Sequence, residues 1–139
     1  MVGLLAFGGM FLLLDQWSKY LAEVHATGRS IPCGRLLRIR CVTNPHKSLS
    51  TGRTRIVLPL FWFLALVCAI VLHSSGTWFQ SRGALFGLGL AFGGAAGNLL
   101  DLLRRQCVLD FIDLGWWPVF NLADVEILTG LVLAFWPRG

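Results

Sequence analysis

The sequence predicts an all-α membrane protein with four transmembrane helices and a small surface β-sheet. Of its 139 residues, 55% are hydrophobic and only 14% are charged, and the mean hydropathy is +0.68. Soluble domains carry roughly 25% charged residues, and a soluble domain this small could not bury so much apolar surface. Four apolar stretches each approach the roughly 20 residues that cross a bilayer. We therefore expect residues 1–139 to form a single polytopic membrane domain.

The four spans are expected at residues 2–22, 56–75, 83–103 and 119–136. All six tryptophans fall near the ends of these spans, at the depth where aromatic side chains meet the lipid headgroups. Pro118 is expected in the first turn of the fourth helix, where its missing N–H costs little.

The connection between the first two spans, residues 23–55, is long, polar and basic. Residues 37–41 alternate apolar and polar side chains, which predicts a short strand, so we place the surface sheet in this loop. Cys33 and Cys41 share the loop, and both a disulfide and two free thiols are compatible with the sequence. The four cysteines contain no C-x-x-C pair of the kind that holds a metal.

The formal net charge is +5 and the isoelectric point is about 9.6. A basic protein of this composition suits anionic lipid headgroups, so membrane lipids are expected partners. Nucleic acid is not, because the sequence contains no basic helix with interleaved aromatic residues.

Two short segments each place an Asn three residues before an Asp. Because consecutive spans alternate in direction, the end of the first and third spans and the start of the second and fourth share one membrane face. This face collects six polar side chains: Asp15, Lys19, Asn98, Asp101, Asn121 and Asp124. Ionisable groups in apolar segments are costly, which makes them functional candidates.

Asp101 and Asp124 have three readings: helix capping or interface residues, a proton or ion site in a transporter, or a catalytic pair, which we favour. Gly89, Gly93 and Gly97 recur every four residues and form a stripe that lets a neighbouring helix approach closely. Asp101 is the next member of that stripe. It should therefore face another helix and not the lipid.

A catalytic pair needs the two carboxyls to differ in protonation. Two close carboxylates do not both ionise easily, so one donates a proton to a carbonyl while the other takes a proton from water. Helix dipoles favour ionised Asp124, near the start of its helix, and protonated Asp101, near the end of its helix. Asn98 and Asn121 would hold the carboxylates or the substrate backbone, with plain interhelical hydrogen bonds as the alternative.

Asp15 and Lys19 are four residues apart and can pair on one helix face. They form either an ion pair at the interface or a contact to a substrate headgroup. Asn44, at the end of the expected strand, is either a turn residue or a ligand for an extended peptide backbone.

Four motifs, in order along the chain, resemble those of the lipoprotein signal peptidases (signal peptidase II) of bacteria. They are Asp15-Gln16-Trp17-Ser18-Lys19, the loop Asn44, Gly97-Asn98-Leu99-Leu100-Asp101 with Val108-Leu109-Asp110-Phe111-Ile112, and Trp117-Pro118-Val119-Phe120-Asn121-Leu122-Ala123-Asp124. The resemblance implies four transmembrane helices and an aspartyl protease that removes the signal peptide from diacylglyceryl-modified prolipoproteins, just before the lipidated Cys.

By the same resemblance, Asp101 and Asp124 are the catalytic dyad, and Asp15, Lys19, Asn44, Asn98 and Asn121 support substrate binding. No metal or cofactor is needed, and the cyclic peptide globomycin is the expected inhibitor. The chain departs from the family pattern at three places: Leu102 replaces an Arg, His46 stands where the loop motif has Gly, and Gln106 replaces a Gly. These departures leave open a paralogue that binds lipopeptide or inhibitor without cleaving. A small four-span transporter that uses the carboxylates as a proton site is a further alternative.

The family orientation places both termini in the cytoplasm and the dyad at the outer face of the bacterial cytoplasmic (inner) membrane. Only Arg82 and Arg138, of 12 basic residues, would then be cytoplasmic, which runs against the positive-inside tendency. We keep the family orientation because its substrate is processed outside.

Overall fold

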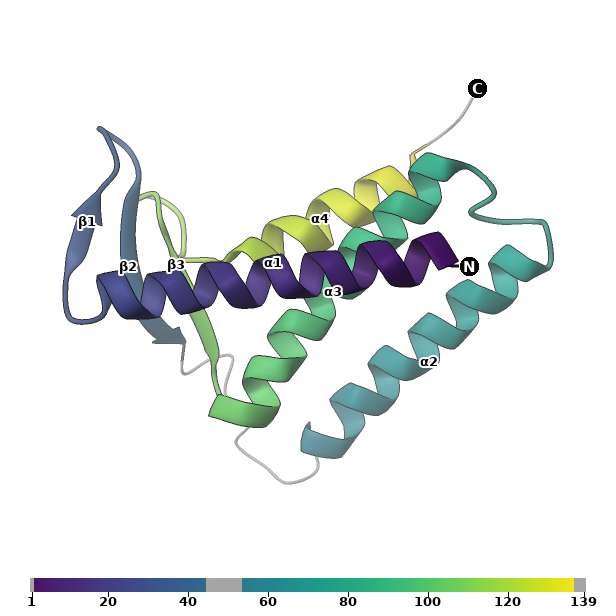
Figure 1. Ribbon diagram of the computed structural model, residues 1–139, viewed down its shortest axis with the longest axis horizontal. Coiled ribbons are helices and arrows are strands. Elements are labelled where there is room, and N and C mark those ends of the chain that lie inside the picture. The colour runs from purple at the N-terminus through teal and green to yellow at the C-terminus, as the bar shows by residue number, and fades with distance from the viewer. Residues whose placement is uncertain (1, 45–53, 137–139) are drawn as a thin grey trace.

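The computed structural model describes residues 2–44 and 54–136. Four helices and three strands follow one another in the order α1 (Val2–Ala26), β1 (Ser30–Pro32), β2 (Arg38–Asn44), α2 (Thr54–Ser74), α3 (Arg82–Arg105), β3 (Val108–Asp113) and α4 (Leu122–Phe135). The sheet lies at one end of the molecule, where β2 and β3 pass beside the C-terminal part of α1 (Figure 1).

Helix α3 is the centre of the bundle. It packs against both α1 and α4, whereas α2 contacts α3 more sparsely and stands apart from the other helices (Figure 1). Within residues 2–44 and 54–136, two helices are long and apolar enough to cross a membrane, over Ile56–Ser74 and Arg82–Arg105. By comparison, α4 has only 14 residues, and α1 carries polar residues in its second half. Of the four expected spans, the described residues therefore support two by length and composition, α2 and α3.

Glycines on both faces of α3 allow this close packing. A Cβ at Gly93 would lie 2.7 Å from the carbonyl oxygen of Gly8 in α1, and one at Gly87 would lie 2.6 Å from the carbonyl oxygen of Gly130 in α4. Any side chain at either position would push backbone against backbone. The predicted glycine stripe is thus a real helix-packing face, and α3 has a second such face directed at α4.

The three strands form one antiparallel sheet in the order β1-β2-β3. The strand expected at 37–41 is present as β2, but the sheet is not confined to the 23–55 loop. Its third strand, β3, comes from the 104–118 connection, where burial of almost every residue removes the alternation that marks a half-exposed strand. Cys33 and Cys41 are free thiols.

The fourth helix begins later than the expected residue 119, and Pro118 lies outside it. Phe120 pairs with Ile112 of β3 in extended backbone, so the chain cannot become helical until it leaves the sheet. Asn121 then caps the helix: its side chain accepts a hydrogen bond from the Asp124 amide, and the Asp124 side chain accepts one from the Asn121 amide. This reciprocal capping box satisfies donors that a helix start leaves open.

Candidate active site

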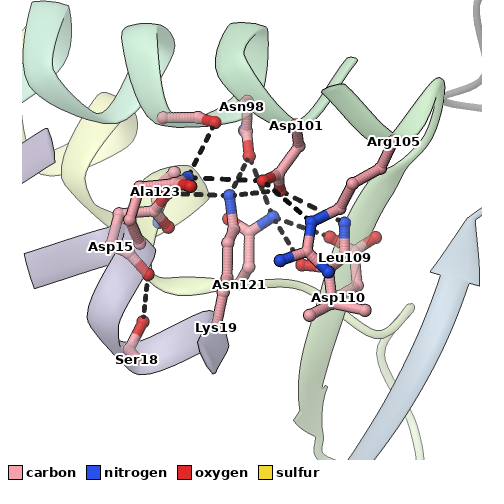
Figure 2. A network of polar contacts seen from close by, with 12 residues as sticks. Asp15, Ser18, Lys19, Asn98, Asp101, Arg105, Leu109, Asp110, Asn121 and Ala123 are labelled. Atoms are coloured by element: carbon pink, nitrogen blue, oxygen red, sulfur yellow. Dashed lines mark hydrogen bonds and ion pairs between the residues drawn. The ribbon is translucent and has the colours of Figure 1, made fainter. Parts of the chain in front are cut away.

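A network of buried polar side chains fills the space between the sheet and the adjoining ends of α1, α3 and α4 (Figure 2). Its fully buried members are 0–1% exposed and come from α1, α3, β3 and the N-cap of α4: Asp15, Lys19, Asp101, Asp110 and Asn121. Burying so many polar groups is costly unless each finds a partner, and the contacts below provide those partners.

Lys19 is the cation at the centre of the network. Its Nζ lies 2.7 Å from Asp15 Oδ2, 2.8 Å from Asp101 Oδ2 and 3.0 Å from Asn98 Oδ1. The pairing expected between Asp15 and Lys19 is present, but it is buried in the protein and not exposed at an interface. One ammonium thus joins two carboxylates and an amide on two helices.

Both oxygens of Asp101 are occupied. Oδ1 accepts a hydrogen bond from Gln16 at 3.3 Å and lies 3.9 Å from Arg105 Nε. Besides Lys19, Oδ2 accepts from the backbone amide of Leu109 at 3.4 Å. Asp101 faces α1, as its place on the glycine stripe predicted, and it also joins α3 to β3.

Asp15 joins α1 to the start of α4. Its Oδ1 accepts a hydrogen bond from the Ala123 amide at 3.1 Å, one of the first amides of α4. The carboxylate packs directly on Gly97, where a Cβ would lie 2.9 Å from Asp15 Cγ. A glycine at 97 is therefore required by the position of the Asp15 side chain.

Asp124 is held by two asparagines and is only partly buried. Its Oδ1 accepts from Asn98 Nδ2 at 2.9 Å, and its Oδ2 accepts from the Asn121 amide at 3.4 Å. Asn98 therefore stands between the two predicted catalytic residues, with its oxygen toward Lys19 and its nitrogen toward Asp124. The six side chains expected on one face form a single connected network.

Asp110 is a third buried carboxyl to which sequence reasoning gave no role. It lies on β3, is 0% exposed, and accepts a hydrogen bond from Asn121 Nδ2 at 2.8 Å. The same nitrogen lies 3.0 Å from Asn98 Oδ1. An Asp inside the apolar run 108–112 was the available signal, because a carboxyl in a buried strand needs a dedicated partner.

The remaining sequence-based candidates lie at the edge of the network or beyond it. Asn44 ends β2 and pairs with Val108 through the backbone, while residues 45–49 of the loop motif, including His46, lie outside the described residues. Gln106 has a φ of 62°, the left-handed conformation that glycine adopts at least cost. Arg105 lies one helical turn beyond Asp101 and binds Glu23 of α1 at 2.6 Å. Among the described residues, no group of three His, Cys, Asp or Glu side chains could hold a metal ion.

An apolar groove of about 560 Å³ leads to the network. It lies between α2, α3 and α4, and Asn98 is a polar residue in its otherwise apolar lining. Leu102, at the position where the family pattern has Arg, also lines the groove. The groove could take an apolar chain whose end reaches the Asn98–Asp124 contact.

Sequence comparisons with known proteins agree on one family. The family model described as "Signal peptidase (SPase) II" matches residues 8–137. A lipoprotein signal peptidase of Rhodococcus jostii is 36% identical over 94% of this chain and 69% of its own length, and one of Moorella thermoacetica is 35% identical over 91% and 86%. A solved bacterial membrane enzyme superposes with a TM-score of 0.76 at 22% identity, covering 94% of this chain and 88% of that one. The solved structure shows the likeness of fold.

Proposed function

Because the chain belongs to the signal peptidase II family, a family of bacterial membrane peptidases, we propose that it removes the signal peptide from lipoprotein precursors. In finer terms, the proposed activity is that of an intramembrane aspartyl endopeptidase. Its substrate is a diacylglyceryl-modified prolipoprotein, which it cleaves just before the lipidated Cys. Globomycin is the expected inhibitor, and no cofactor enters the proposed reaction.

The observation that carries the proposal is a partly exposed carboxyl, Asp124, at the junction of a buried polar network and an apolar groove. Asn98 lines the groove and donates to Asp124 at 2.9 Å. An acyl chain or an apolar signal segment in the groove would lie next to this carboxyl. Such an arrangement suits a substrate that is lipid-modified and membrane-embedded.

The length of α4 supports a reaction below the membrane surface. We propose that all four helices span the bilayer, with the site toward the outer face. The 14 residues of α4 rise about 21 Å, less than the roughly 30 Å of a hydrocarbon core. If the far end of α4 reaches one interface, Asp124 lies beneath the opposite one, where β3 and the network shield it from lipid.

The proposed chemistry uses two carboxyls that share one proton. One carboxylate takes a proton from the attacking water, and the protonated partner donates to the scissile carbonyl. Asp124 is one member. The sequence assigns the other role to Asp101, while the contacts add Asp110 as a second candidate, because Asp101 is already bound by Lys19 and Asp110 shares Asn121 with the Asp124 cap.

Cleavage of a diacylglyceryl prolipoprotein by purified protein, followed as a size shift on a gel, tests the proposal. Asp124→Asn is expected to lower turnover by orders of magnitude, since catalytic carboxyls act as a unit. Comparing Asp101→Asn with Asp110→Asn identifies the partner: the variant that stays folded yet loses turnover as completely as Asp124→Asn carries the second catalytic carboxyl. Asp113→Asn, at the far end of β3, is the control and should cleave normally.

The outcomes separate the competing functions. Full turnover by Asp124→Asn would remove the carboxyl pair from the mechanism. Binding of globomycin or lipopeptide without cleavage by the wild type would replace the peptidase with a non-catalytic binding protein. A transporter needs charges spaced along the membrane path, whereas Asp15, Asp101 and Asp110 gather in one polar network (Figure 2).

A further inference from the structure

Two exposed loops adjoin paired strand ends, because the β1–β2 turn leads into β2 where β3 ends. The β1–β2 turn contains Arg35 and Leu36, and β2 begins at Arg38, which pairs with Asp113 at the end of β3. The β3–α4 connection begins directly after Asp113 with a turn, in which the Gly115 amide donates a hydrogen bond to Asp113 Oδ1 at 2.8 Å. The strand register therefore places Trp116 and Trp117 beside the start of β2.

Large apolar side chains are exposed on these loops. Leu36 and Trp116 are each 74% exposed and Trp117 is 57% exposed. The two indole rings contact each other edge to face, with their centroids 5.7 Å apart. Exposed tryptophans beside polar backbone are typical of the membrane–water interface, where the ring is apolar and its N–H is hydrated.

Positive charge surrounds these apolar groups. Arg35 and Arg38 are exposed, and neither forms an ion pair with a residue inside the described ranges 2–44 and 54–136. Arg40, next along the same strand face, is bound to Asp113 at 2.6 Å, and Arg38 acts on the same carboxylate without a contact ion pair, so the guanidinium groups of Arg35 and Arg38 remain open to an anion. We call Arg35, Leu36, Arg38, Trp116 and Trp117 the arginine–tryptophan patch.

We propose that the arginine–tryptophan patch binds the phosphate groups of anionic phospholipids in the leaflet next to the site. Guanidinium groups bind phosphate oxygens through paired hydrogen bonds, while Leu36 and the two indoles insert at headgroup depth. The patch lies at the same end of the bundle as the carboxyl network, so this contact fixes the height of the sheet against the membrane. The inference goes beyond the cleavage reaction and does not depend on it.

Tryptophan quenching in nanodiscs tests the proposal with the full chain. The discs contain phosphatidylcholine and a minor share of phosphatidylglycerol, with bromine on the acyl chains of one lipid or the other. Subtracting the signal of a Trp116→Phe/Trp117→Phe variant isolates the patch tryptophans. We expect brominated phosphatidylglycerol, once corrected for its share, to quench them roughly twofold or more above brominated phosphatidylcholine, and 1 M NaCl to abolish that preference.

Charge variants separate the patch from the general charge of the protein. Arg35→Gln/Arg38→Gln should lose the preference, whereas Arg82→Gln, at the start of α3 and the opposite end of the bundle, should keep it. Equal quenching by the two lipids in the wild type would overturn the proposal. So would a preference that survives in the double variant or is insensitive to salt.

Discussion

Replacing Gly97 by Ala is expected to displace Asp15 and loosen the joint between α1, α3 and α4. The added methyl group would lie 2.9 Å from Asp15 Cγ and 3.3 Å from its Cβ. An ordinary carbon–carbon contact is about 3.5–4.0 Å, so the Asp15 carboxyl has to move by about 0.6 Å or more. A shift of that size would break its 3.1 Å hydrogen bond from the Ala123 amide.

The cost follows from these contacts. Overpacking costs about 1–3 kcal/mol, and losing a hydrogen bond to a charged group adds about 1.5–3 kcal/mol. The higher helix propensity of Ala returns about 1 kcal/mol. The free energy of unfolding should therefore fall by roughly 1.5–5 kcal/mol.

Thermal unfolding in detergent, followed by intrinsic tryptophan fluorescence, measures this effect, and the cleavage assay shows whether the site suffers as well. Gly9→Ala is the matched control, because Gly9 is an exposed helical glycine with nothing within 4 Å of its added Cβ. It should melt at or above the wild-type temperature. If Gly97→Ala melts like Gly9→Ala, Asp15 is not clamped as described.

Three further substitutions test single features of the network and the sheet. Lys19→Met leaves Asp15 and Asp101 without their cation and should cost about 3–5 kcal/mol of stability; a melting temperature within a degree of the wild type would contradict the central role of Lys19. Glu126 is 3% exposed and its Oε2 has no partner among the described residues. Glu126→Met should therefore raise the melting temperature, because it removes an unsatisfied buried oxygen. A lower melting temperature would show that the Glu126 carboxyl contributes to stability or function. The Gly115 amide and the Arg40 guanidinium lower the pKa of Asp113 below 3.8, so the stability that its carboxylate adds is complete above pH 3.8 and disappears as the pH falls through the lower folded pKa. The difference in the free energy of unfolding between wild type and Asp113→Asn should decrease over that acid range. A difference that does not change with pH would refute this account.

The helices and their close packing could be predicted because both depend on local sequence. Apolar stretches mark the helices, and a four-residue glycine repeat marks the face on which α1 packs. The repeat also gave the direction of Asp101 correctly, since a helix fixes which residues share a face. The second packing face of α3 contains Gly87 and Gly94 and contacts α4. The sequence does not predict it, because only the position of α4 shows that these two glycines belong to one contact surface.

The end of the 104–118 connection could not be predicted from local pattern. Its strand is buried almost throughout and therefore lacks alternation, and Pro118 looks like a helix start when its surroundings are unknown. The pairing of Phe120 with Ile112 delays α4 until Asn121. That delay is what places Asp124 at the third helical position, where the capping box and Asn98 both reach its carboxylate.

The tertiary position of Lys19 also limits what helix dipoles can decide. In the sequence Lys19 pairs with Asp15 alone, but in the fold it also contacts Asp101, and the trio carries a charge of −1 when both carboxyls are ionised. A dipole contributes about 0.3–1 kcal/mol near a helix end, less than opposite charges in contact where screening is weak. An argument from helix dipoles alone omits the Lys19 ammonium, which is the charge in direct contact with Asp101. Asp15, Lys19 and Asp101 therefore have to be treated as one ion-paired unit, and only the fold shows that Asp101 belongs to it.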